Sequence, residues 1–249
     1  MKKGLWLYLG LFALGAALLL GGGAQAQSIT IDTGTEGGLT ERILQLVALM
    51  TVLSLAPSIV IMTTSFVRIT VVLSLLRTGL GLQQSPPNAV LVSLAMFLTA
   101  FIMAPVFTQS YNEGIEPLLN NEIELTEAFD LSTDPLKAFM LMHTREEDLG
   151  LFIGMSQSEI PETPADTSFF VVAPAFMISE LRRAFEIGFL LFIPFLVIDL
   201  VVASILMSMG MMMLPPVVIS LPFKLIFFVL VDGWRLVTGA LVQSFGTIT

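Results

Sequence analysis

The 249-residue sequence contains no cysteine, few charged residues and a single histidine. The absence of cysteine excludes a structural disulfide, a thiolate metal site and a cysteine nucleophile. Charged residues make up 12% of the chain, well below the roughly 25% that is usual in soluble domains. Because 55% of the residues are hydrophobic, the composition predicts an integral membrane protein or a protein buried among membrane partners.

The sequence also lacks the short motifs of common enzyme classes. It contains no G-x-S-x-G, Walker A loop, Rossmann glycine pattern or H-E-x-x-H. His143 has Glu146 and Glu147 at helical spacing, which is a partial pattern of metal ligands. Structural metal sites need three or four converging ligands. A solvated helix face is therefore the preferred interpretation of His143. The chain is predicted not to be an enzyme and to hold no metal or cofactor.

Negative charge is concentrated in one part of the chain. The formal net charge is −9, and residues 108–186 hold 15 acidic residues against four basic ones, a local net charge of 4 − 15 = −11. Binding to nucleic acid requires a basic face. The charge pattern therefore excludes nucleic acid as a partner.

The first 26 residues have the pattern of a secretory signal. Lys2 and Lys3 precede an apolar run over residues 5–20, and small residues stand at Ala24 and Ala26. This pattern predicts a signal peptide over residues 1–26 that is cleaved after Ala26. The alternative is an uncleaved first membrane helix. Residues 27–42 are polar and glycine-rich and are expected to form a periplasmic lead-in.

Two apolar segments and an acidic section follow. Residues 43–62 and 88–107 are long enough to span a bilayer, and they predict a first helical hairpin over residues 43–107, with Arg68 and Arg77 in its connecting loop. Residues 108–184 form an acidic, mostly helical periplasmic section with short helices at 120–130, 135–141 and 143–152. Pro174 is expected to open the next helix.

Residues 185–249 predict a C-terminal hydrophobic hairpin. Gly210 and the pair Pro215 and Pro216 break the helical pattern between two apolar segments. Asp199 and Lys224 lie in opposite segments, and their midpoint, (199 + 224)/2 = 211.5, falls in this turn. Ions at matching depth neutralise each other in an apolar setting. We expect a structural ion pair, and the alternative is a proton relay that uses Asp199.

The turn is unusually rich in methionine. Five of the chain's 14 methionines lie within seven residues: Met207, Met209, Met211, Met212 and Met213. Methionine is flexible and polarizable, so it adapts to irregular surfaces. Two interpretations remain open: the side chains pad a lipid-facing turn, or they form a compressible seal when the turn is repeated around a pore.

Several long blocks carry a resemblance to a known family. They are FIPFLVIDLVVASILMSMGMMMLPP, LPFKLIFFVLVDGWRLVTGALVQSF, TTSFVRITVVLSLLR, PPNAVL, PLKAFML and TREEDL. Over residues 62–245 the chain resembles the FliP family of flagellar biosynthesis proteins, whose relatives serve in injectisomes. The resemblance implies an all-α, ring-forming subunit of the type III export gate, built from membrane-type helical hairpins.

The resemblance also implies partners, a location and roles for particular residues. Family members form a homo-pentamer with FliQ and FliR in the inner membrane at the flagellar basal body, with a large periplasmic portion, and conduct unfolded flagellar subunits. Met211, Met212 and Met213 match the methionine gasket of the closed channel, and Met209 extends it. Asp199 and Lys224 match a charged pair. The positions linked to ring assembly are Phe139, Phe152 and Glu180.

The residues and the resemblance leave three functions open. The preferred one is a pore-forming core subunit of the flagellar protein export gate that has no enzymatic activity. A small proton-coupled membrane transporter using Asp199 is the alternative. A third possibility is an assembly scaffold that never lines the conduit. A gate subunit depends on partner proteins, whereas a transporter works alone or as a small oligomer.

Overall fold

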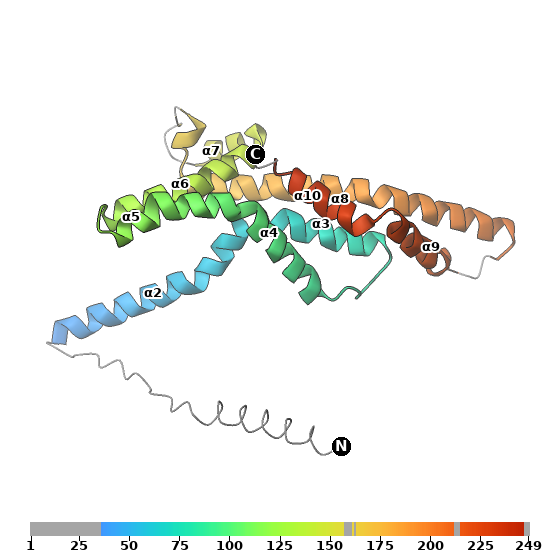
Figure 1. Cartoon of the computed structure of the whole chain (residues 1–249), viewed down its shortest axis with the longest axis horizontal. Coiled ribbons are helices and arrows are strands. Elements are labelled where there is room, and N and C mark those ends of the chain that lie inside the picture. The colour runs from blue at the N-terminus through green and yellow to red at the C-terminus, as the bar shows by residue number, and fades with distance from the viewer. Residues whose placement is uncertain (1–35, 157–160, 162, 212–214, 247–249) are drawn as a thin grey trace, which may run out of the picture. The chain divides into compact units, whose positions relative to one another are not determined.

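The computed structural model describes residues 36–156, 161, 163–211 and 215–246 (Figure 1). Within these ranges the chain forms helices joined by short connections and has no strand, so the predicted all-α fold is confirmed. The chain divides into two compact units, Met1–Val52 and Leu53–Thr249. The predicted signal peptide lies outside the described residues.

Helices α2 and α3 form the first part of the described chain. Helix α2 spans Glu36–Met62, so its first part belongs to the first unit, and α3 spans Phe66–Gly79. The expectation of a loop around Arg68 and Arg77 is wrong, because both residues lie in α3. The apolar residues of α3 recur at helical spacing and are buried: Ile69, Val72, Leu73 and Leu76. This buried face stabilises a helix where the basic residues suggested a connection.

Helix α4 and helix α6 pack against each other in the second unit. Helix α4 (Asn88–Ser110) continues through a π-helical turn, η1 (Tyr111–Ile115), into α5 (Glu116–Leu119), and α6 spans Leu125–His143. Gly114 allows η1 to approach α6 closely. A Cβ at this position would lie 2.6 Å from the carbonyl oxygen of Ala128 and from Ser132, a distance that no side chain tolerates without backbone movement.

In the acidic section, one longer helix, α6, replaces the two short helices expected at 120–130 and 135–141. Residues 125–143 form one helix with Pro135 inside it, and α7 spans Glu146–Met155. The buried residues Ala128, Pro135, Phe139 and His143 recur at helical spacing on both sides of the proline. Packing of this face outweighs the backbone hydrogen bond that Pro135 cannot donate. A short 3₁₀ turn, η2, follows at Pro164–Asp166.

Helix α8 is the longest element and spans Phe169–Ser208, 40 residues (Figure 1). It begins five residues before Pro174, where a helix start was expected, and it runs without a break across residues 184 and 185. Helices α3, α6, α7 and α9 (Pro216–Leu230) pack against it. At Gly188 a Cβ would lie 2.2 Å from Leu75 Cδ1, so this glycine lets α3 approach α8 closely. Helix α10 spans Gly233–Gln243.

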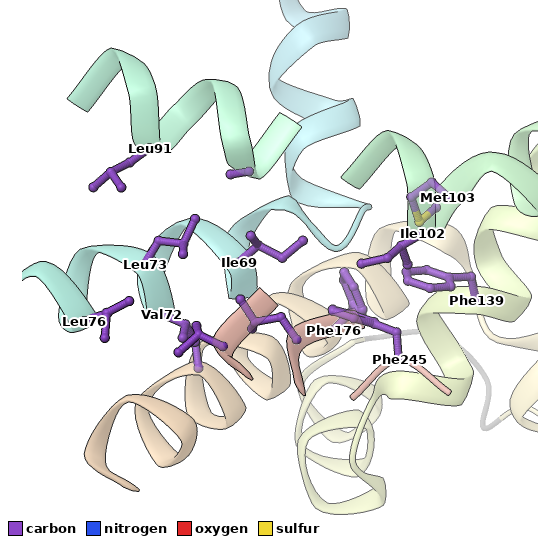
Figure 2. Packing of buried hydrophobic residues seen from close by; sticks show 14 of the residues in the cluster. Ile69, Val72, Leu73, Leu76, Leu91, Ile102, Met103, Phe139, Phe176 and Phe245 are labelled. Carbon is purple, nitrogen blue, oxygen red and sulfur yellow. The ribbon is translucent and has the colours of Figure 1, made fainter. Parts of the chain in front are cut away.

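The hydrophobic core of the second unit lies between α3, α4, α6, α8 and the residues after α10 (Figure 2). Fully buried members include Ile69 and Val72 of α3, Met103 of α4, Met140 of α6 and Phe176 of α8. Aromatic rings meet in the same region. The ring centroids of Phe139 and Phe176 are 6.0 Å apart, and those of Phe139 and Phe245 are 6.1 Å apart.

Two helical stretches of the described chain are long and apolar enough to cross a membrane: Asn88–Leu119 and Phe169–Ser208. The number rises to four if each of two bent pairs counts as one span. These pairs are Leu46–Met62 with Phe66–Gly79, and Pro216–Leu230 with Gly233–Gln243. Together with the composition, these helices define a membrane-type protein.

Candidate functional site

The structure brings Asp199 of α8 and Lys224 of α9 together. Lys224 Nζ lies 2.7 Å from Asp199 Oδ2. The Lys224 side chain is 4% exposed and that of Asp199 is 30% exposed. The two residues meet because α9 packs back against α8.

Two further groups hold this ion pair. Ser220 Oγ is fully buried and donates a hydrogen bond of 2.5 Å to Asp199 Oδ1. Lys224 Nζ also donates to the carbonyl oxygen of Gly79, at 3.3 Å. Gly79 is the last residue of α3, where unpaired carbonyl groups carry partial negative charge. The pair therefore joins three helices, α3, α8 and α9.

The end of α8 leads into the methionine-rich connection. Gly210 has a φ of +73°, which glycine adopts at little cost. Its N–H donates to the carbonyl of Met207, and the N–H of Met211 donates to the carbonyl of Leu206, both at 3.0 Å. This pair of bonds is a Schellman motif, which terminates the helix.

The methionines beside this motif point away from the core. Met209 is 66% exposed and Met211 is 40% exposed. Met212 and Met213, the other two predicted gasket residues, lie outside the described residues. A helix end fixed by its backbone hydrogen bonds thus carries exposed, flexible side chains.

A second ion pair was not predicted from the sequence. Arg68 of α3 and Glu180 of α8 are 1% and 0% exposed and form a two-pronged contact. Arg68 Nε donates to Glu180 Oε2 at 2.8 Å, and Nη2 donates to Oε1. The sequence contains a signal for the burial of Arg68, because this residue shares a helix face with Val72 and Leu76, four and eight residues later.

The same arginine holds the end of the chain after α10. Arg68 Nη1 donates hydrogen bonds to the carbonyl oxygen of Ser244 at 3.1 Å and to its Oγ at 2.9 Å. The guanidinium carbon of Arg68 lies 3.7 Å from the centroid of the Phe245 ring, a cation–π contact. The donors of this buried cation are thereby satisfied, which burial requires.

His143 is buried, so the interpretation as part of a solvated face is wrong. It is 6% exposed, and its ring centroid lies 4.7 Å from that of Phe139 and 5.2 Å from that of Phe245. Burial, and then the nearby charges of Arg68 and Arg183, lower the pKa of His143 from 6.5 to about 4. Within the described ranges, no three acidic or histidine side chains converge around His143.

The three residues predicted to act in ring assembly have different surroundings. Phe139 is 9% exposed and Glu180 is fully buried, so both belong to the interior of the second unit. Phe152 is only partly buried in α7, a helix without a fully buried residue. On α7, Leu151 and Met155 are 52% and 61% exposed. The part of Phe139, Phe152 and Glu180 in assembly stays a prediction.

The surface of the described chain fits a protein that assembles in a membrane environment. Large apolar side chains are exposed on several helices, including Phe97 (76%), Phe101 (67%), Phe170 (86%) and Leu230 (79%). Soluble monomers rarely expose apolar surface on this scale. The fold and its exposed apolar faces define the class: a helical, membrane-associated protein.

Comparison with known proteins gives the family. The model of the FliP family matches residues 49–241. Relatives named "Flagellar biosynthetic protein FliP" include one from Caulobacter vibrioides, 68% identical over 231 residues, covering 92% of this chain and 87% of the relative. A relative from Bacillus subtilis is 55% identical over 201 residues (81% and 91%), and one from Aquifex aeolicus is 49% identical over 224 residues (89% and 93%).

The chain belongs to the FliP family. Membership gives it a role in the flagellar export apparatus at a membrane, as a structural component and not as an enzyme. The resemblance noted in the sequence is confirmed. The candidate site is therefore structural and not catalytic. It consists of the two ion pairs and the methionine-rich connection.

The Asp199–Lys224 pair gives a prediction that a double-mutant cycle tests. Lys224→Met leaves the Asp199 carboxylate without its cation, and Asp199→Asn leaves a buried ammonium group, so we expect each change to lower the free energy of unfolding by about 3 kcal/mol. The double variant should lose clearly less than the sum. Unfolding of the detergent-solubilised chain measures all four variants, and simple additivity would show that the two groups do not interact.

The buried His143 gives a prediction about pH. Its pKa is about 4 in the folded chain and about 6.5 when unfolded, so the unfolded chain binds more protons between these values. Stability from His143 is complete above pH 6.5 and falls as the pH decreases to about 4, by about 3 kcal/mol in total. Unfolding curves measured from pH 7.5 to 4 for the wild type and His143→Gln isolate this contribution. Parallel pH profiles for the two proteins would contradict it.

Proposed function

We propose that the chain is a pore-forming core subunit of the flagellar type III export gate and conducts unfolded flagellar subunits across the inner membrane. It does so as a homo-pentamer with FliQ and FliR. The observation that carries this proposal is the hairpin of α8 and α9. Its depth is fixed by the Asp199–Lys224 pair, and its connection carries exposed methionines beside a Schellman motif.

The methionine-rich connection acts as the gasket of the closed channel. A seal needs a rigid support and a deformable edge. The ion pair and Ser220 supply the support, and Met209 and Met211 begin the deformable edge, which Met212 and Met213 continue. Unbranched thioether side chains adapt to one another when copies of the connection meet around an axis.

Asp199 serves as a structural residue in this proposal and not as a proton carrier. Both of its oxygens are engaged, Oδ1 by Ser220 at 2.5 Å and Oδ2 by Lys224 at 2.7 Å. A proton relay requires a carboxylate that is open to proton exchange with water, whereas the Asp199 oxygens accept hydrogen bonds from Ser220 and Lys224. These contacts favour the export gate over the proton-coupled transporter.

The organisation of the chain follows the same proposal. Residues 1–26 are a signal peptide removed on export, residues 27–42 and 108–184 are periplasmic, and the hairpins at 43–107 and 185–249 are membrane-type. Ring assembly uses Phe152, which is partly exposed on α7. Phe139 and Glu180 affect assembly indirectly, because they pack within each copy and set the positions of α6 and α8.

Substitution of the methionines tests the gasket. We expect Met211→Ala, Met212→Ala and Met213→Ala combined to make cells or proteoliposomes containing the closed complex leak ions and small solutes, severalfold above the wild-type level. The complex should still assemble, because these side chains lie beyond the ion pair. Met142→Ala is the matched control, since Met142 is 76% exposed on α6. Unchanged permeability in an assembled triple variant would refute the gasket.

A further inference from the structure

A pocket lined by three arginines lies apart from the methionine-rich connection. Its volume is about 440 Å³, and its walls come from α3, the start of α7, α8 and the residues after α10. The lining residues are Arg68, Arg145, Arg183, Glu186, Ile187 and Ser244. We call this site the arginine pocket.

Two of the three guanidinium groups have donors that the chain does not satisfy. Arg68 is fully engaged by Glu180, Ser244 and Phe245. Arg145 Nη2 forms an ion pair with Glu147, but Nη1 is shielded from solvent and has no hydrogen-bond acceptor within the described ranges. The Asp148 carboxylate oxygen lies 3.9 Å from it. Arg183 is half-buried and forms no hydrogen bond or ion pair with any part of the chain that the structure describes. Shielded donors without acceptors are costly, so an acceptor from another molecule would stabilise the pocket.

The charges around the arginine pocket also favour an anionic ligand. Arg68 and Arg183 contribute to the lowered pKa of the neighbouring His143, so their positive potential extends beyond the pocket. Glu186 at the rim is 60% exposed and is engaged by Arg182, whose Nε lies 3.1 Å from Glu186 Oε1. The carboxylate at the rim is therefore paired with Arg182 and not with Arg183.

An acidic surface elsewhere on the same chain carries the opposite charge. Seven carboxylates on η1, α5, α6 and the residues between α5 and α6 are exposed, and none forms an ion pair with another described residue. They are Glu113, Glu116, Glu122, Glu124, Glu127, Asp130 and Asp134. We call them the acidic surface. Like charges gathered in this way repel each other, and a basic site on a neighbouring molecule relieves the repulsion.

We propose that the arginine pocket binds a carboxylate from the acidic surface of a second copy of the chain, with Arg183 and Arg145 as the donors. This inference rests on the proposed function, because it names a contact that builds the ring. Each copy carries one pocket and one acidic surface at different places, so the contact is head-to-tail, and repeated head-to-tail contacts close into a ring. Guanidinium groups suit carboxylates because their donors match the two oxygens.

A cysteine cross-linking scan tests this contact directly, because the chain contains no cysteine of its own. Arg183→Cys is combined in turn with a cysteine at each of the seven acidic positions, in the full-length protein co-expressed with FliQ and FliR. We expect at least one combination to give covalent oligomers up to the full ring on oxidation. Arg182→Cys is the matched control, since Arg182 is 55% exposed and faces Glu186, and it should give none.

Charge reversal provides a second, independent measurement. Arg183→Glu should reduce the share of chain found in rings by about tenfold, consistent with the loss of a charged interface pair. Reversal of the cross-linked acidic residue to Lys should restore the rings in that background. Rescue separates loss of the contact from loss of folding, because a misfolded variant gains nothing from a distant second change.

The outcomes separate this inference from the proposed function. If the wild type forms rings but no combination cross-links and Arg183→Glu assembles normally, the contact is refuted and the ring remains. If Arg183→Gln instead removes an anionic phospholipid that the wild type retains in native mass spectrometry, the pocket binds a lipid phosphate, and the second-copy assignment is also refuted. If the wild type itself forms no ring, the proposed function fails.

Discussion

The buried contact between Arg68 and Glu180 is the constraint on which the second unit depends. Burial of each ion costs several kcal/mol, and attraction compensates for this only when the geometry is close and the remaining donors are paired. Glu180, Ser244 and Phe245 together meet this condition for Arg68. Because these groups come from α3, α8 and the end of the chain, none of the three segments can shift without leaving a charge buried alone.

A second anchor fixes the other end of α3. Arg68 lies near its start, and Gly79, at its end, accepts a hydrogen bond from Lys224. Along α8 the two anchors, Glu180 and Asp199, are 199 − 180 = 19 residues apart, about 28 Å in a helix. Helix α3 is thus fixed to α8 at both ends, with the close approach at Gly188 between them. This arrangement makes a stiff support for the methionine-rich connection.

The sequence was informative where local pattern decides the structure. The all-α fold follows from the apolar periodicity, and Asp199 and Lys224 could be paired because a tight hairpin relates equal distances from a turn. The partner of Arg68 lies 112 residues away, a separation that no local pattern encodes. Burial of His143 depends on Phe245, also distant in sequence. Pro135 and Pro174 suggested helix starts, but tertiary packing outweighed the local preference at both positions.

In the proposed export gate, the chain is a repeated subunit around a passage, with rigid anchors inside each copy and a deformable edge where copies meet. The native mass of the detergent-extracted complex, for the chain alone and with FliQ and FliR, tests this most directly. The account predicts a pentameric ring whose mass increases when the partners are present. A stable monomer or dimer whose mass is unaffected by either partner would contradict it and would favour a transporter that works through Asp199.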